Sequence, residues 1–325
     1  MRIGWMVPHL GCFGSIREVV ELSNALIDRG HAVTIHHQEG TPCAWLPCQA
    51  AVGPTDAALA AGYDLLLLVT EWRRSDYERL LQADARVRGV VVMGFTPTDD
   101  FAQLLDGWPH TPSNGGAVLA DALHREDVAV FADGPWQLEW IEQQTACQTA
   151  TWLGGVNTTM FTPDPAKRGP ISIGASGDPR DRKGTDTVQA AMRIVRARHP
   201  RLQLATYWGK RLDQDQLVEW YQRRHVFLDG HRRGGWCNPV FEAMACGAAV
   251  VCTDIGAVQP LAVHGETALV VPMDDAAGMA DAVEWLLGSA PRIERLGEAA
   301  VRKARYYTYG RAAWRLESWL ERALA

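Results

Sequence analysis

The sequence lacks several features that mark particular classes of protein. It has no apolar run close to the ~20 residues that a membrane-spanning helix needs, and it does not begin with the pattern of a signal peptide. Its seven cysteines form no CxxC pair and show no zinc-ligand spacing. We therefore expect a cytoplasmic globular protein with structural thiols and no metal site. Peripheral contact with a membrane surface stays open.

Lysine is absent from residues 1–150, which hold 9 arginines and 19 acidic residues, a net charge of −10. Residues 151–325 hold the other 23 basic residues and 19 acidic ones, a net charge of +4, and the two halves sum to the chain's −6. An acidic first half disfavours nucleic acid as a partner, whereas a mildly basic second half suits a ligand that carries phosphate.

The first glycine-rich turn also lacks the G-x-G-x-x-G pattern of dinucleotide-binding folds, since it contains Gly11-Cys12-Phe13-Gly14. An NAD-dependent oxidoreductase, with Glu39 as the ribose ligand, is therefore the weakest of three functional hypotheses. Asp99 and Asp100, in a loop-like stretch at 99–116, are candidates for an N-terminal catalytic group, although paired loop acids are more often only solvated.

Short apolar runs alternate with helical periodicity along the whole chain, which predicts an α/β protein with two parallel sheets in tandem. We expect domains at 1–153 and 170–306, a linker at 154–169 and a C-terminal helix in 307–325. The expected strands are 2–7, 31–37, 65–69, 89–93, 128–131, 149–153, 171–174, 203–208, 226–228, 248–252 and 269–271; the expected helices are 15–29, 75–83, 137–144, 185–198, 214–223, 276–287, 292–306 and 311–325.

The stretch 234–256, GGWCNPVFEAMACGAAVVCTDIG, predicts a site for an anion. Asn238 is a good N-cap, Pro239 suits the first helical position, and Gly247 can end the helix in a left-handed conformation. Phosphate binds readily at such a helix N-terminus. Glu242, one turn inside the helix, is placed to accept hydrogen bonds from a pair of hydroxyls.

Four stretches in this order resemble the retaining family-4 glycosyltransferases: GGVNTTMFTP at 154–163, RKGTDTVQAA at 182–191, NPVFEAMACGAAVVCTDIGA at 238–257 and HGETALVVPMDD at 264–275. The resemblance implies the GT-B fold, with two facing Rossmann-like domains, a cleft between them and a C-terminal helix that returns to the N-terminal domain. It also implies transfer of a sugar, with retention and without a metal, from a nucleotide-diphosphate sugar that serves as co-substrate. UDP and GDP sugars are the expected donors, and a small molecule or glycan is the favoured acceptor.

The resemblance also assigns roles to individual residues. Lys183, Arg180 and Glu242 are the expected catalytic residues, with Lys183 on the donor diphosphate and Glu242 on the ribose. The remaining donor-binding residues are Gly14 and Ser15 in the first domain, and Arg182, His231, Gly235, Trp236, Cys237 and Asn238 in the second.

The chain departs from the family pattern at three places. Gly234 occupies the position of the first glutamate of the Glu-x7-Glu pair that ends at Glu242, and Gly94-Phe95-Thr96 stands where an N-terminal histidine is common. The arginine before the lysine motif is displaced, so that Arg180 or Arg182 would replace it. These departures support a second hypothesis, a non-catalytic relative that binds a sugar nucleotide and acts as a regulatory subunit.

Overall fold

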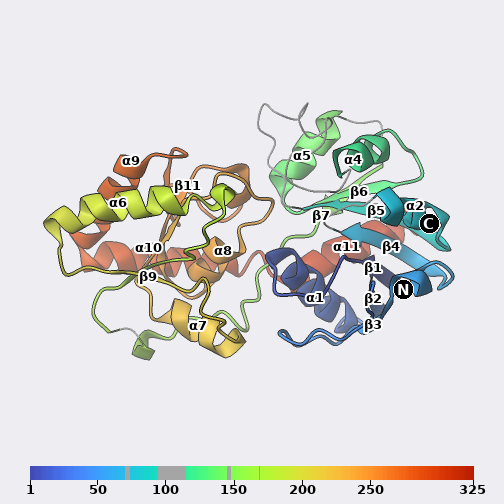
Figure 1. The fold of residues 1–325 in the computed structure, drawn as a ribbon, viewed down its shortest axis with the longest axis horizontal. Helices are drawn as coiled ribbons and strands as arrows, with labels where there is room; N and C mark the ends of the chain where they lie inside the picture. The colour runs from blue at the N-terminus through green and yellow to red at the C-terminus, as the bar shows by residue number, and fades with distance from the viewer. Residues whose placement is uncertain (70–73, 94–114, 145–147, 168) are drawn as a thin grey trace. The chain divides into compact units, whose positions relative to one another are not determined.

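The computed structural model describes residues 1–69, 74–93, 115–144, 148–167 and 169–325. Gly94-Phe95-Thr96, Asp99 and Asp100 lie outside these residues. The described chain forms two compact units: unit 1 comprises Met1–Gly155 with Tyr309–Ala325, and unit 2 comprises Val156–Thr308. Each unit is a parallel β-sheet covered by helices (Figure 1), as the alternating sequence pattern predicts.

The sheet of unit 1 has the strand order β3-β2-β1-β4-β5-β6-β7, and all its paired strands run parallel. Its strands are β1 (Arg2–Met6), β2 (Ala32–His37), β3 (Ala51–Pro54), β4 (Tyr63–Val69), β5 (Ala85–Val92), β6 (Ala129–Ala132) and β7 (Gln148–Trp152). Its helices are α1 (Gly14–Ile27), η1 (Thr55–Ala58), α2 (Arg74–Gln82), α4 (Gly115–Leu123), α5 (Pro135–Gln144) and α11 (Tyr309–Leu324).

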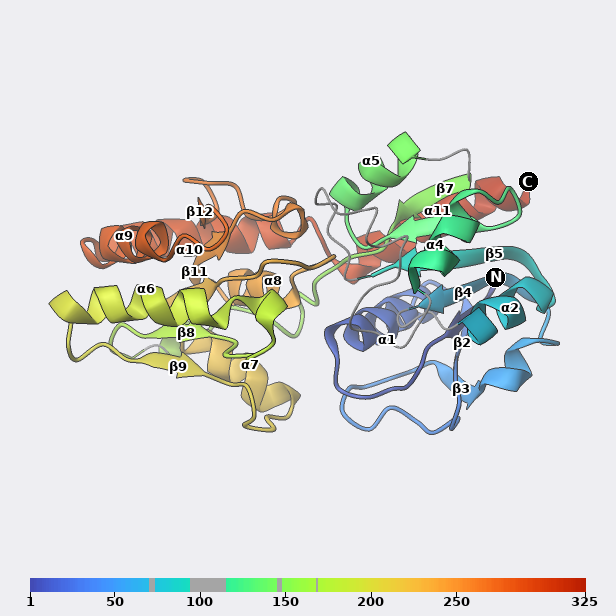
Figure 2. The same ribbon diagram turned by 45° about the horizontal axis from the view of Figure 1, so that its top comes forward.

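Alternating side chains of the unit 1 strands pack against helices on both faces of the sheet. One face, with Leu66, Leu68 and Val90, packs under α2 and α4, and the other contains Phe131, whose ring meets Trp319 of α11 edge-on at 4.9 Å. Burial on both faces explains why these strands are almost continuous apolar runs. Figure 2 shows the helices on either side of the sheet.

The C-terminal helix α11 belongs to unit 1, which confirms the predicted return of the chain to its first domain. Glu317 of α11 forms an ion pair with Arg29 and lies 3.1 Å from the His31 Nε2, and both residues follow α1. Arg315 stacks its guanidinium over the Trp152 ring at 3.3 Å from the ring centroid. The last helix is therefore attached by charged groups as well as by apolar packing.

Unit 2 has a five-stranded sheet in the order β12-β11-β10-β8-β9. Helices α6 and α9 cover one face, and an aromatic cluster that includes Trp220, Tyr221 and Phe227 lies on the face covered by α7. Its strands are β8 (Ile173–Ala175), β9 (Leu204–Thr206), β10 (Val226–Asp229), β11 (Ala249–Thr253) and β12 (Leu269–Val271). Its helices are η2 (Pro165–Lys167), η3 (Asp181–Lys183), α6 (Thr185–Arg198), α7 (Gln214–Gln222), α8 (Asn238–Ala245), η4 (Gly256–Val258), α9 (Ala276–Leu287) and α10 (Ala290–Ala304).

The structure differs from the sequence prediction at a few elements. Strand β3 was not expected, because it is a four-residue edge strand that contains Gly53 and Pro54, two residues that weaken a strand pattern. Helix α4 occupies Gly115–Leu123, just after a stretch expected to be a loop. Residues 156–163 lie in unit 2, where Phe161 is buried against Tyr221.

Candidate functional site

Two loops of unit 2 cross at a pair of glycines, Gly184 after η3 and Gly230 after β10. A Cβ on Gly184 would lie 1.8 Å from the Gly230 carbonyl oxygen, and one on Gly230 would lie 2.3 Å from the Gly184 oxygen. Gly184 also has φ +54°. Only glycine allows so close a contact between the two backbones, and this contact places Lys183 beside His231.

Lys183, His231 and Asp229 form a chain of hydrogen bonds at this crossing. The Nδ1 of His231 lies 2.6 Å from Asp229 Oδ1, and its Nε2 lies 2.5 Å from the Nζ of Lys183. A carboxylate can only accept and an ammonium can only donate, so this geometry requires a neutral imidazole with its proton on Nδ1. Asp229 thus fixes the histidine tautomer, and the histidine holds the lysine.

Burial and charge set the protonation of the three groups. Burial lowers the pKa of Lys183 to about 8, with a further contribution from the Arg182 charge. Burial also lowers the pKa of His231, although Asp229 opposes the shift. Burial would raise the pKa of Asp229, but the interactions with His231 and Lys183 outweigh it and lower this pKa. Near neutral pH the chain is therefore carboxylate, neutral imidazole and ammonium.

Arg182 is a second cation in the same turn. Its side chain forms no hydrogen bond or ion pair with any residue in the described part of the chain, and burial lowers its pKa, helped by Arg180. The carboxylates nearby are already engaged, Asp178 by Arg180 and Asp229 by Lys183 through the neutral His231. The charge of Lys183 is therefore balanced by Asp229, whereas the desolvated charge of Arg182 has no carboxylate partner in the described chain.

Arg180 and Arg232 have different surroundings. Arg180 pairs with the buried Asp178 and lies over the Trp208 ring, 5.3 Å from its centroid. Arg232 contacts three carboxylates, at 3.0 Å from Asp181, 2.8 Å from Asp186 and 2.7 Å from Asp274. Hydrogen bonding to Asp186 raises the pKa of Arg232 further. Arg232 therefore links its own loop to the segments that carry these three aspartates, and their carboxylates fully compensate its charge.

Helix α8 begins one residue earlier than the sequence indicates. Its N-cap is Cys237, which has no side-chain capping bond, and Asn238 and Pro239 are already helical. The prediction that Asn238 is the N-cap is therefore wrong, because the Cys237 carbonyl accepts the first helical bond, from Phe241. Gly247 has φ +79° and ends the helix as predicted.

The residues before α8 are well packed. Gly235 is buried, Cys237 is 1% exposed, and the Trp236 ring meets Phe241 at 4.5 Å. Cys237 also lies within electrostatic reach of Lys183. The positive end of the α8 dipole thus adjoins the two cations, and this combination favours an anion.

Glu242 is buried, with 5% of its surface exposed, and it is hydrogen-bonded to the Tyr221 hydroxyl. The same hydroxyl lies 3.1 Å from that of Tyr207. Burial, with the charge and hydrogen bond of Glu242 contributing, raises the pKa of Tyr221 well above its usual value. The Tyr221 phenol therefore stays protonated, and its hydrogen bond holds the buried Glu242 carboxylate in place.

Gly234, in the position of the family's first glutamate, has room for a side chain to begin. Among the described residues, a Cβ there would meet only Cys237 Sγ at 3.5 Å and His231 Cδ2 at 3.8 Å, which are ordinary contacts. No described residue therefore requires a glycine at this position by packing.

Gly14 and Ser15 are in unit 1, where they are the first two residues of α1, with Phe13 as N-cap. All the other predicted site residues are in unit 2. Sequence analysis missed Asp229 and Asp178. The signal for Asp229 was an aspartate at the end of a buried strand with a histidine two residues later.

Comparison with known proteins relates the segment that holds this site to a family. Residues 177–289, about a third of the chain, match the family model "Glycosyl transferases group 1", and this segment includes Lys183, His231 and Glu242. The lipopolysaccharide core biosynthesis mannosyltransferase LpsB of Rhizobium meliloti is 28% identical over 182 residues, 43% of this chain and 51% of that protein. A D-inositol 3-phosphate glycosyltransferase of Corynebacterium diphtheriae is 35% identical over 104 residues, 32% of this chain and 24% of that protein. The chain thus aligns with between a quarter and about half of the length of these relatives, 24% and 51%.

Solved structures match the fold over nearly the entire chain. Sucrose-phosphate synthase from Thermosynechococcus elongatus superposes with a TM-score of 0.77 at 17% identity, covering 99% of this chain and 98% of that one. Trehalose 6-phosphate synthase from Burkholderia multivorans gives 0.68 at 14% identity with the same coverage. The chain has the GT-B fold, and residues 177–289 match the model of the group 1 glycosyltransferases. Both predictions are confirmed at this level, whereas membership of family 4 remains a prediction.

Two other kinds of feature are absent from the described residues. No helix there combines the length and apolar character needed to cross a membrane. No group of three or more His, Cys, Asp or Glu side chains there is arranged to hold a metal ion.

Proposed function

We propose that this chain is a retaining glycosyltransferase that transfers a sugar from a nucleotide-diphosphate sugar, with UDP or GDP as the leaving nucleotide, to a hydroxyl acceptor. The observation that carries the proposal is the pair of desolvated cations, Arg182 and Lys183, next to the N-terminus of α8 in a group 1 domain. Asp229 balances the charge of Lys183, so the pair keeps one uncompensated positive charge, that of Arg182. A desolvated charge of this kind costs free energy unless a ligand of opposite charge binds it.

The chemistry of transfer needs such charges. As the sugar leaves, negative charge builds up on the diphosphate oxygens, and preorganised cations and helix dipoles stabilise that charge. Arg182 and Lys183 would supply the positive charge without a metal ion. Asp229 and His231 would hold the Lys183 ammonium in position through its hydrogen bond.

Glu242 is the proposed ligand of the nucleotide ribose. A carboxylate can accept several hydrogen bonds, so the bond from Tyr221 would orient Glu242 while the ribose hydroxyls bind it. Gly14 and Ser15 at the start of α1 would supply backbone amides to the donor. The names of the curated relatives point to saccharide and cyclitol acceptors, and we infer a small molecule or glycan acceptor here.

The decisive experiment is a screen of UDP, GDP, ADP and TDP sugars by thermal shift, followed by transfer and donor-hydrolysis assays with the best ligand. We expect Lys183→Ala to weaken nucleotide binding by about 10- to 100-fold, because hydrogen bonds to charged groups contribute about 1.5–3 kcal/mol. Lys303→Ala, a lysine of α10 in the same unit, is the matched control and should bind normally. Equal binding by both variants would refute the diphosphate role.

The ribose role has its own test. The native chain should bind a nucleotide more tightly than its 2′-deoxy analogue, and Glu242→Gln should reduce that difference, since the amide keeps the size of the side chain but weakens the acceptor. An unchanged preference for the ribonucleotide in Glu242→Gln would remove Glu242 from the nucleotide site.

One observation favours a second function, a non-catalytic subunit that binds a sugar nucleotide: Gly234 replaces the first glutamate although a side chain would fit there. Gly234→Glu restores the carboxylate. If the native chain binds nucleotide sugar without turnover and Gly234→Glu gains turnover, the regulatory function is supported. Turnover by the native chain rejects it.

A further inference from the structure

Unit 1 contains a pocket at the carboxyl ends of its central strands. The chain leaves β1 for β2 and β3 on one side and continues through β4 on the other, so β1 and β4 flank the point where the strand order reverses. Ligands of open α/β sheets bind in the crevice at this point. The pocket, of about 340 Å³, is lined by residues that end or follow β1, β2, β3 and β4 and by α2. Its volume is at the lower end of the ~300–1,000 Å³ typical of small-molecule sites.

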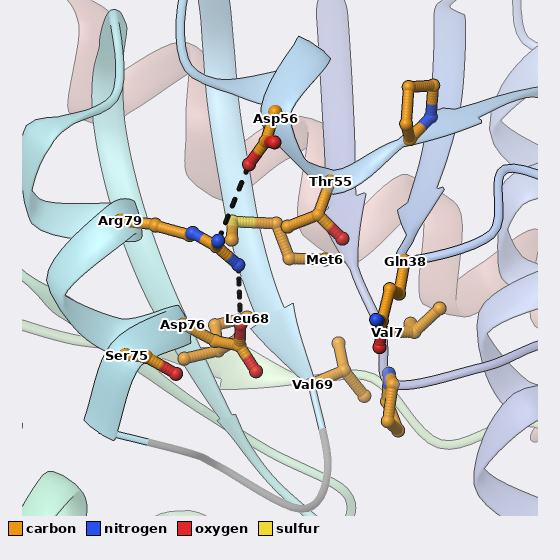
Figure 3. A pocket seen from close by; sticks show the side chains of 12 residues that line it. Met6, Val7, Gln38, Thr55, Asp56, Leu68, Val69, Ser75, Asp76 and Arg79 are labelled. Carbon is orange, nitrogen blue, oxygen red and sulfur yellow. Dashed lines mark hydrogen bonds and ion pairs between the residues drawn. The ribbon is translucent and has the colours of Figure 1, made fainter.

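The pocket has an apolar base and a polar rim, as Figure 3 shows. Met6, Val7, Leu68 and Val69 contribute the apolar side chains, and all four are buried. The rim carries hydrogen-bonding groups from three separate elements, Gln38 after β2, Thr55 and Asp56 in η1, and Ser75, Asp76 and Arg79 in α2. Such a lining suits a compact ligand with an apolar ring face and several polar substituents.

The charges of the rim determine which ligand fits. Among the described residues of the lining, Arg79 is the one cation, and it already pairs with Asp56 at 3.5 Å and with Asp76 at 3.4 Å. The three groups together carry one negative charge. A phosphate or carboxylate would therefore approach two carboxylates with no unpaired cation in the described lining to neutralise it, whereas hydroxyls can donate to both. The net charge of −10 over residues 1–150 acts in the same direction.

We propose that this pocket binds the acceptor, and that the acceptor presents an uncharged polyhydroxylated ring, a sugar or cyclitol, rather than a phosphorylated one. The assignment as acceptor rests on the proposed glycosyltransferase function, while the binding preference stands on the pocket itself. Asp56 and Asp76 accept hydroxyl hydrogens, Arg79 keeps the two carboxylates in place, and the apolar base contacts the ring carbons.

The experiment measures binding to the full chain by saturation-transfer NMR and calorimetry, with D-glucose, D-mannose and myo-inositol as neutral probes and D-glucose 6-phosphate as the anionic probe. We expect at least one neutral probe to bind at least 5-fold more tightly than D-glucose 6-phosphate. Asp76→Asn and Arg79→Met should each weaken that neutral probe by about 5-fold or more. Binding of no neutral probe, or equal binding of the phosphorylated one, overturns the proposal.

A matched control lies on the same helix. Glu78 of α2 also pairs with an arginine, Arg74 at 3.1 Å, but does not line the pocket, so Glu78→Gln should leave sugar binding unchanged. If Glu78→Gln weakens binding as much as Asp76→Asn, the effect is one of helix stability and the proposal fails. Nucleoside diphosphate affinity, measured on the same variants, should stay within 2-fold.

Sugar binding and sugar transfer, measured on the same variants, separate the pocket proposal from the proposed glycosyltransferase function. Sugar binding that depends on Asp76 without transfer from any nucleotide sugar supports the pocket and contradicts the proposed function. Transfer with an acceptor KM that is the same in Asp76→Asn, Arg79→Met and the native chain supports the function and rejects the pocket.

Discussion

The two units use the same architecture to build sites of opposite chemistry. In each unit the candidate site lies at the carboxyl ends of the two strands where the strand order reverses, β1 and β4 in unit 1 and β8 and β10 in unit 2. In unit 2 that place holds the desolvated cations Arg182 and Lys183, of which Asp229 balances only Lys183. In unit 1 it holds Asp56 and Asp76 over an apolar base.

The difference shows that the fold fixes where a ligand binds and the loops fix which ligand binds. A site of buried cations is costly without an anion, so unit 2 suits a phosphate-bearing donor. A rim of carboxylates with its cation already paired suits hydroxyls. The opposite net charges of the two halves of the sequence follow the same division.

The largest effect should follow from separating the loops that build the unit 2 site. Gly184→Ala would place a methyl 1.8 Å from the Gly230 carbonyl oxygen at φ +54°, so we expect a loss of unfolding free energy of about 3 kcal/mol or more. Gly209→Ala is the control, because Gly209 likewise has a positive φ, +77°, but no described atom lies within 4 Å of the added Cβ. The backbone strain alone costs about 1–2 kcal/mol. Urea unfolding followed by tryptophan fluorescence measures both. Equal losses in the two variants would mean that the crossing is not tight.

Much of this comparison could be predicted from the sequence, and the exceptions have physical causes. The strands were predictable because burial on both faces makes them apolar runs, and local motifs selected Lys183 and Glu242 as candidates whose roles stay predictions. The contact of Lys183 with His231 was not, because it depends on a backbone crossing between residues 46 positions apart, Gly184 and Gly230.

The unit 1 pocket was also missed. It requires η1 to follow β3, and β3 is a short edge strand whose Gly53 and Pro54 hide the strand pattern. The start of α8 was misplaced by one residue because propensity favours Asn over Cys as an N-cap, while the actual start is set by the loop that brings Cys237 to Lys183.

A pH titration should distinguish the two sites. Lys183 has a pKa of about 8 and loses its positive charge as the pH rises through that value, so nucleotide affinity should fall by up to about 10-fold per pH unit above pH 8. Neutral-sugar binding to unit 1 should stay constant between pH 7 and 9. Calorimetry at four pH values would measure both.

The assignment of this alkaline loss to Lys183 needs a control, because Cys237, His231, Asp229 and the nearby arginines also surround it. Cys237→Ser removes the thiol beside Lys183 and should keep the loss. A profile that becomes flat in Cys237→Ser would contradict the role of the lysine.

The smallest difference in nucleotide affinity is expected between variants of two arginines of unit 2. It tests whether an arginine must lack a carboxylate partner to bind the donor. Arg182→Ala should weaken nucleotide binding by about 10-fold, because Arg182 has no ion-pair partner in the described chain. Arg232→Ala should change that affinity by less than 3-fold, because three carboxylates already neutralise Arg232. Arg232→Ala should instead lower the free energy of unfolding modestly, by about 1 kcal/mol, because the ion pairs of Arg232 are partly exposed. If Arg232→Ala weakens nucleotide binding as strongly as Arg182→Ala, total charge rather than local compensation governs the site, and the contrast between the two units would then reduce to their net charge.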